Sequence, residues 1–299
     1  MTEFRYTVTE EDSKNKLQVK DLLRRDFSFS SRLRAKIKKA DTVFLNGEHM
    51  RPFWIPEPGD EILVKLPEEE PSHYTLEPIK IEPVFEDDDF LIINKQPGYT
   101  VHPTKGHPDH TIANGVMKYM EDTGQSFKIR FVNRLDMDTS GLLVLGKNAY
   151  IQDKFVKEMH TDKVKKIYTG IVKGIIEEEE GTVDAPIGQP DPEKVGRGVV
   201  EGGQESVTHY KVLKRFPKGY TMLSLLLETG RTHQIRVHMS FIGHPVVGDP
   251  LYGGDAPWLI DRQALHASRL IFTHPVTREK IDITAPLPDD INEVIEKIK

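Results

Sequence analysis

The chain has 299 residues, a formal net charge of −6, and a composition of 37% hydrophobic and 29% charged residues. These values are typical of a globular protein with room for one large domain and one small domain. The absence of cysteine excludes disulfides, thiolate catalysis and cysteine-ligated zinc, and it fits a cytoplasmic protein. No apolar run approaches the length of a membrane span, so we expect no membrane association.

Positive charge is concentrated near the amino terminus. Residues 15–39 hold nine Lys or Arg and two Asp, a net charge of +7, so the remaining residues together carry −13. A basic segment on an acidic chain predicts contact with nucleic-acid phosphates. A solvated helix face would have the same composition, so both interpretations stay open.

The first 66 residues predict helices followed by strands. Ser30 or Ser31 can cap the second helix, and Asn46-Gly47 is a strong hairpin-turn signal. The expected elements are helices at 17–25 and 31–39 and strands at 42–46 and 61–66.

This order of elements resembles the small RNA-binding domain named after ribosomal protein S-four. The resemblance implies a small α/β RNA-binding domain over residues 1–66. Candidate phosphate contacts are the cations of its second helix, Arg32, Arg34, Lys36 and Lys38.

A second, larger domain is expected after a linker. Residues 67–80 are rich in proline and acid and lack any apolar period, which predicts the linker. Residues 81–299 would form the second domain, and a glycine-rich segment at 196–203 predicts a mobile loop. The expected elements are strands at 80–85, 90–95, 164–172, 206–216 and 220–228 and helices at 111–122 and 148–160.

The stretch Arg134-Leu135-Asp136 carries the first chemical signal. In an extended segment Arg134 and Asp136 share one face, so both can point into a cleft while Leu135 points into the core. An arginine beside the carboxylate would keep it ionised, as nucleophilic or base catalysis at a sugar carbon requires. Alone, the pair fits equally a surface ion pair that contributes little.

Two further motifs lie downstream. In Lys166-Ile-Tyr168, strand alternation puts Lys166 and Tyr168 on one face, although Tyr168 alone fits an ordinary half-buried aromatic. In Thr229-Gly-Arg-Thr-His-Gln-Ile-Arg-Val-His-Met239, Thr232 can cap a helix on which Arg236 lies at the edge between core and cleft. The histidines lack metalloprotease spacing and no phosphate-binding glycine loop is present, so we expect neither metal nor nucleotide cofactor.

Together these motifs resemble the RluA-type pseudouridine synthases, in the same order along the chain. The resemblance implies an α+β fold, in which a large bent, mostly antiparallel mixed sheet is flanked by helices and has the cleft along its middle. It implies isomerisation of uridines in structured ribosomal or transfer RNA. It also implies catalytic roles for Asp136, Tyr168 and Arg236 and RNA contacts by Asn133, Arg134, Lys166, Arg231 and His233.

The implied reaction breaks the N-glycosidic bond, rotates the uracil, and rejoins its carbon 5 to the ribose. Nothing is oxidised and no group is donated, so no cofactor is expected. Arg236 would pair with Asp136, and Tyr168 would stack on uracil and assist proton removal at carbon 5. Asp136 would either attack the anomeric carbon or remove the neighbouring proton to give a glycal, and the sequence does not choose.

Asn133 departs from the family pattern, which has histidine at this position. Asparagine keeps a donor and an acceptor but cannot be charged, so we expect altered substrate fit with activity retained. Two other functions remain open: a non-catalytic RNA-binding or ribosome-assembly factor, and a glycosidase using Asp136 with Asp138, which lacks a separately placed acid. We expect the protein to act as a monomer.

Overall fold

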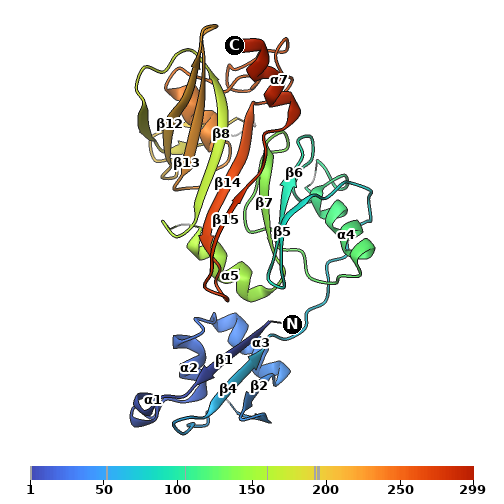
Figure 1. Cartoon of the computed structure of the whole chain (residues 1–299), viewed down its shortest axis with the longest axis vertical. Coiled ribbons are helices and arrows are strands. Elements are labelled where there is room, and N and C mark those ends of the chain that lie inside the picture. Colours follow the sequence, from blue (N-terminus) through green and yellow to red (C-terminus); the bar gives the residue numbers. More distant parts are fainter. Residues whose placement is uncertain (1, 52, 105, 160, 192, 194–195) are drawn as a thin grey trace.

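The computed structural model describes residues 2–299 except 52, 105, 160, 192 and 194–195. The described residues form a four-stranded sheet, a nine-stranded sheet and a two-stranded ribbon. Figure 1 shows the small sheet and its helices as one unit below the large sheet. None of the helices in the described part of the chain has the length and apolarity needed to cross a membrane.

The small unit packs three helices against an antiparallel sheet of order β1-β4-β2-β3. Ser30 caps α3, and Asn46 and Gly47 have positive φ in the β2–β3 turn, so both sequence signals are confirmed. The sequence analysis missed β1 and α1. The elements are β1 (Glu3–Thr7), α1 (Glu10–Lys14), α2 (Val19–Arg25), α3 (Ser31–Ala40), β2 (Val43–Leu45), β3 (Glu48–His49) and β4 (Glu61–Lys65).

The large sheet has the order β5-β6-β7-β14-β8-β13-β12-β9, with β15 paired to β14. Only β7 and β14 run parallel among its described neighbours, so the expected mostly antiparallel mixed sheet is confirmed. Its strands are β5 (Pro83–Glu86), β6 (Phe90–Lys95), β7 (Ser140–Gly146), β8 (Lys165–Lys173), β9 (Glu180–Asp184), β12 (Val207–Phe216), β13 (Tyr220–Leu227), β14 (Leu265–Thr273) and β15 (Lys280–Thr284).

Four helices accompany the large sheet in the part of the chain that the structure describes. In Figure 1, α4 lies beside β5 and β6, α5 lies at the end nearest the small unit, and α7 lies at the opposite end. The helices expected at 111–122 and 148–160 are confirmed as α4 and α5. The helices are α4 (Ile112–Thr123), α5 (Ala149–Glu158), α6 (Gln234–Phe241) and α7 (Asp289–Ile298).

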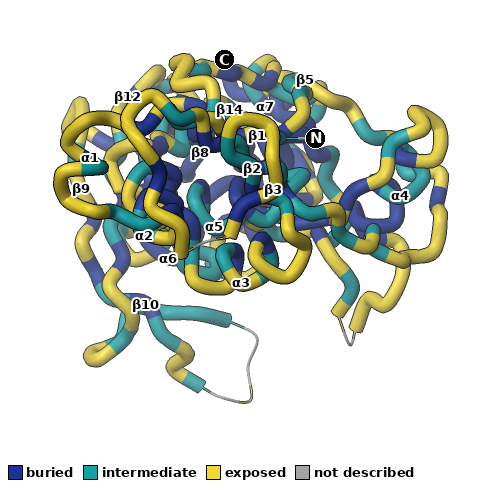
Figure 2. Tube along the Cα trace, turned by 90° about the horizontal axis from the view of Figure 1, so that it is seen from below, coloured by how far each residue is buried: buried dark blue, intermediate teal, exposed yellow. Residues whose placement is uncertain are grey.

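The glycine-rich segment at 196–203 is a loop except at β11 (Gly198–Val199), which pairs with β10 (Ile187–Gly188) in a ribbon that projects from the molecule in Figure 2. One local expectation is wrong. Thr232 does not cap α6: the N-cap is His233, with φ 57° and no side-chain cap. The Gln234 side chain instead accepts hydrogen bonds from the Arg231 amide and the Thr229 hydroxyl, so the turn is closed from within the helix.

The expected linker forms no helix or strand, yet polar contacts attach it to both units. Glu69 pairs with Lys36 of α3 at 2.6 Å and with Arg130 of the large unit. The ring of Tyr150 in α5 lies 4.7 Å from that of Phe4, which joins the two cores edge to face. The small unit is therefore packed onto the large one at this junction.

Candidate active site

Asp136 lies in the loop just before β7. The Asn133 side chain fastens this loop, because its Nδ2 donates to the Leu142 carbonyl at 3.2 Å and its Oδ1 accepts from the Val144 amide at 2.8 Å. Leu135 is buried and Arg134 exposed, as alternation predicted. Both polar atoms of the Asn133 amide are engaged by β7, so this side chain supports the loop, and its expected contact with RNA stays a prediction.

Lys95 holds the same loop from the opposite side. It ends β6, its side chain is completely buried, and its Nζ donates to the carbonyls of Met137 at 2.7 Å and Thr139 at 2.9 Å. Burial lowers the pKa of Lys95 to about 7, and the Asp138 carboxylate opposes this shift. This role was not expected from the sequence, although a lysine so close after the apolar run Phe90–Ile93 is an unusual local signal.

Gly141 allows β7 to approach β14 directly beyond the loop. Its φ is +110°, and a Cβ there would lie 2.3 Å from the Ala267 carbonyl oxygen. Only glycine fits this position without displacing β14. The Thr-Ser-Gly part of the motif is therefore required by packing and sets where the Asp136 loop leaves the sheet.

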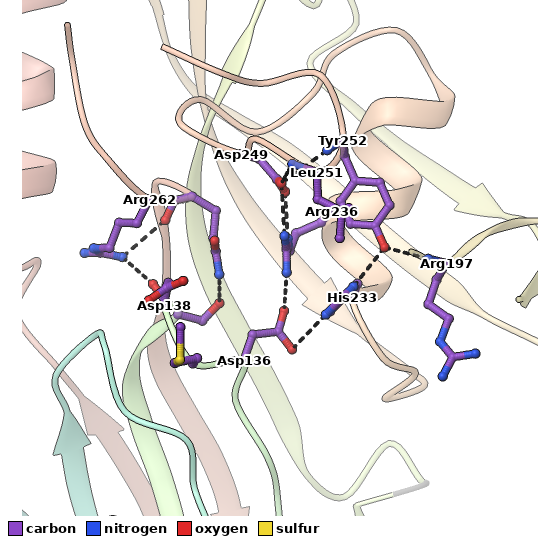
Figure 3. Close-up of polar contacts among 12 residues, drawn as sticks. Asp136, Asp138, Arg197, His233, Arg236, Asp249, Leu251, Tyr252 and Arg262 are labelled. Atoms are coloured by element: carbon purple, nitrogen blue, oxygen red, sulfur yellow. Dashed lines mark hydrogen bonds and ion pairs between the residues drawn. The ribbon is translucent and has the colours of Figure 1, made fainter. Parts of the chain in front are cut away.

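Arg236 of α6 lies between two carboxylates, as Figure 3 shows. Its NH1 is 3.1 Å from Asp136 Oδ2, so the expected pair across one hundred residues is confirmed. Its Nε and NH2 donate to the completely buried Asp249 at 2.6 and 3.0 Å. Burial lowers the pKa of Arg236, but the hydrogen bonds and charges of Asp249 and Asp136 outweigh burial and raise it overall.

The paired charges orient the catalytic candidate firmly. The carboxylate of Asp249 accepts hydrogen bonds from Nε and NH2 of Arg236, so the remaining nitrogen, NH1, faces Asp136. The arginine that pairs with Asp136 is therefore Arg236 of α6 and not the neighbouring Arg134. Among the described residues, no ion pair joins Arg134 to Asp136. No role for Asp249 was expected from the sequence, because no motif or spacing along the chain connects residue 249 to residue 136.

His233 completes the contacts of Asp136 (Figure 3). Its Nε2 lies 3.9 Å from Asp136 Oδ1, and its Nδ1 is 2.8 Å from the hydroxyl of Tyr252. That hydroxyl also accepts a hydrogen bond from the Arg197 amide at 2.8 Å. Burial lowers the pKa of His233, against the attraction of Asp136.

Tyr168 of β8 forms the apolar wall of the cleft. It is buried, and no hydrogen bond reaches its hydroxyl from the residues that the structure describes. Burial raises the pKa of Tyr168, and the Asp136 charge raises it further, so the phenol keeps its proton at neutral pH. Lys166 shares this strand face as predicted, and its Nζ donates to the Met159 carbonyl at 2.9 Å.

These side chains surround a cleft of about 470 Å³, lined among others by Asp136, Tyr168, Arg231, His233 and Arg236. Arg231 also donates to the Glu205 carbonyl. The described residues contain no group of three His, Asp or Glu placed to hold a metal ion. The cations expected to bind RNA on α3 lie in the small unit, outside this cleft: Arg32, Arg34, Lys36 and Lys38.

Comparison with solved structures defines the class to which this fold belongs. The human protein RNA Pseudouridylate Synthase Domain Containing 4 matches with a TM-score of 0.60 and 22% identity, over 73% of this chain and 92% of that chain. The human protein RNA Pseudouridylate Synthase Domain Containing 1 matches with a TM-score of 0.59 and 24% identity, over 73% and 94%. The fold is that of a pseudouridylate synthase domain.

The sequence comparisons show the family. Residues 89–241 match the family described as RNA pseudouridylate synthase. Uncharacterized RNA pseudouridine synthase YjbO of Bacillus subtilis (strain 168) is 41% identical over 91% of this chain and 96% of its own length. Ribosomal large subunit pseudouridine synthase D of Pseudomonas aeruginosa is 38% identical over 87% and 84%. The chain belongs to the RNA pseudouridylate synthase family and is an isomerase that acts on RNA.

Proposed function

We propose that this protein converts specific uridines of large-subunit ribosomal RNA to pseudouridine, with Asp136 as its catalytic residue. The observation that carries the proposal is the ion pair of Asp136 and Arg236, backed by the buried Asp249 and lining one cleft with the phenol of Tyr168. The ribosomal substrate is supported by the name of the Pseudomonas aeruginosa relative. We further propose a cytoplasmic protein that acts as a monomer, in keeping with its cysteine-free sequence.

The proposed reaction needs the target base outside its helix, at an unstacking cost of about a few kcal/mol. Asp136 then acts at the ribose, either by attack on the anomeric carbon or by removal of the neighbouring proton. The bond from nitrogen 1 to the anomeric carbon breaks, carbon 5 takes its place, and the proton lost from carbon 5 is balanced by one gained at nitrogen 1. Atoms and charge balance within the nucleotide, so the proposal includes no cofactor.

The neighbouring side chains have separate tasks in this proposal. Arg236 pairs with Asp136 and directs it into the cleft. Tyr168 stacks on the detached uracil, and its hydroxyl relays the carbon 5 proton as a neutral phenol, since its pKa is raised. His233 lies beside the second oxygen of Asp136 and limits its rotation.

The test is a comparison of pseudouridine maps of total RNA from a deletion strain that carries the wild-type gene or Asp136→Asn. We expect the wild type to restore pseudouridine in large-subunit RNA and the variant to lose turnover by roughly 10³-fold or more. RNA affinity of the variant should be almost unchanged, because the amide keeps the shape of the carboxylate.

The same experiment separates the other functions. Substantial turnover by Asp136→Asn would remove the proposed catalytic role. Restored sites in transfer RNA would correct the substrate, and unchanged maps in the deletion strain would favour a non-catalytic RNA-binding factor. Release of free uracil by the purified protein, lost in Asp138→Asn, would instead support a glycosidase.

A further inference from the structure

A second depression, here called the side groove, adjoins the Asp136 cleft. The two share Arg134, Tyr168, Leu227 and Gly230 in their linings. The side groove opens to solvent and holds about 1380 Å³ of space, about three times the 470 Å³ of the cleft. Its space is therefore available to a part of the substrate next to the reacting nucleotide.

The charge of the side groove is opposite to that of the chain. Its lining includes the cations Arg130, Arg134 and Lys166 and no Asp or Glu among the described residues. The chain as a whole has 47 acidic and 41 basic residues. A lining without carboxylates in such a chain favours an anionic occupant, because any nearby acid would repel it.

Aromatic and apolar side chains also line the side groove. Tyr74 comes from the segment before the large sheet and is 36% exposed, and His102 is exposed on another loop. Val156 and Met159 of the α5 region add apolar surface. Aromatic faces together with cations suit a nucleic-acid strand whose bases are unpaired, since only unstacked bases can lie against them.

The side groove also leads toward the basic helix of the small unit. Arg130 lies in its lining and pairs with Glu69, which pairs with Lys36 of α3. Arg32 is close enough for its charge to lower the pKa of Arg130, a shift that burial dominates. The paired charges of Arg130, Glu69 and Lys36 thus link the side groove to α3.

We infer that the side groove binds the single-stranded RNA segment next to the target uridine and directs it onto α3. This inference rests on the proposed function, because it identifies the groove's occupant as part of the substrate. It assigns Tyr74 to stacking on an unpaired base and Lys166 to a phosphate. Selection of the target would then depend on unpaired nucleotides beside the uridine as well as on the uridine itself.

The test uses fluorescein-labelled octauridine RNA and measures its affinity by anisotropy over a range of salt concentrations. Tyr74→Ala and Lys166→Gln are compared with matched controls outside the groove, Trp258→Ala and Lys165→Gln. Trp258 is 68% exposed, and Lys165 neighbours Lys166 on the opposite face of β8. We expect each groove variant to bind about fivefold or more weakly. Lys166→Gln should flatten the log–log salt slope by about 0.7.

Photo-cross-linking with octauridine carrying one 4-thiouridine gives a second measurement. It uses the wild-type protein, so it does not depend on whether a variant folds. We expect cross-links to peptides containing Tyr74 or residues 129–134. Absence of octauridine binding, equal affinities of groove and control variants, cross-links elsewhere, or equal binding of the octamer annealed to its complement would each overturn the inference. Binding needs no turnover, so Asp136→Asn protein gives the same readings and a failure of the proposed catalysis is detected separately.

Discussion

The Asp136 cluster and the outer face of α3 are both rich in charge, but their charges are arranged in opposite ways. In the cluster, the Arg236 side chain is 8% exposed and is bound by Asp136 and by a completely buried Asp249. On α3, Arg32 and Lys38 are exposed, and no hydrogen bond or ion pair to either occurs among the described residues. Water screens the charges of α3, whereas each charge in the cluster depends on its protein partner.

This difference suits the two regions to different tasks: the cluster to holding reacting groups in place, and α3 to contacting phosphates. Buried partners fix the positions of reacting groups, and loss of one partner leaves the other uncompensated. Exposed cations keep their mobility and exchange water for phosphate at little cost. We therefore expect large, specific effects from changes in the cluster and small, nearly additive effects from changes on α3.

The largest effect on stability is expected for Asp249→Asn. The amide keeps the shape of Asp249 but removes the charge that holds two guanidinium nitrogens of Arg236. The free energy of unfolding should fall by about 3–5 kcal/mol, and turnover should fall by roughly 10²-fold as Arg236 loses its orientation. Chemical denaturation and single-turnover kinetics measure the two effects.

The control for Asp249→Asn is Asp282→Asn, which breaks the exposed pair with Arg269. It should leave stability and turnover unchanged within error, because water screens both partners. Wild-type turnover by Asp249→Asn would contradict the idea that a buried partner positions Arg236.

Lys95 extends the comparison to a buried charge paired with carbonyls only. Its pKa is lowered to about 7 in the folded protein from 10.5 in a free side chain. Between these values the folded protein holds Lys95 neutral and the unfolded chain holds it protonated, so unfolding takes up a proton. The free energy of unfolding must therefore rise with pH across this window.

The measurement compares wild type with Lys95→Met by urea denaturation from pH 6 to pH 10. The unfolding free energy of the wild type, minus that of Lys95→Met, should increase by about 1.4 kcal/mol per pH unit above about pH 7. Below that pH the difference should be flat, because both states are protonated. A flat difference over the whole range would mean that Lys95 stays charged, held by the carbonyls of the Asp136 loop.

The smallest effects are expected on α3. The double variant Arg32→Gln and Lys38→Gln should weaken RNA binding severalfold and flatten the log–log salt slope by about 0.7–0.9 for each lost phosphate contact. Turnover at saturating RNA should not change, since the cluster is untouched. Lys157→Gln, on the exposed face of α5, is the matched control. Equal salt slopes for all three proteins would make α3 a solvated surface.

Lys36 and Arg34 require a different expectation from the other α3 cations. Lys36 pairs with Glu69, and Arg34 donates to the Phe29 carbonyl and the Ser31 hydroxyl. From the sequence, all four cations of this helix were expected to contact phosphate. The tertiary contacts distinguish Lys36 and Arg34 from Arg32 and Lys38. Substitutions of Lys36 should therefore loosen the junction of the two units in addition to any effect on RNA.

The elements with strong local patterns could be predicted from the sequence. The apolar spacing of α3 and α4 and the buried run of β6 placed each within about two residues, because backbone geometry sets these periods. The sequence pattern did not predict β1 and α1, because β1 buries only Phe4 fully and α1 has no apolar residue at all.

The site followed a different rule. The pairing of Asp136 with Arg236 was expected from resemblance to a family, while Lys95, Asp249 and Tyr252 entered only with the tertiary structure. Periodicity reports which face of a helix or strand a residue occupies. The partner of a buried charge depends on which loops the sheet order brings together, here the ends of β6 and β7 beside α6. That order results from packing of the whole core, and no spacing along the chain encodes it.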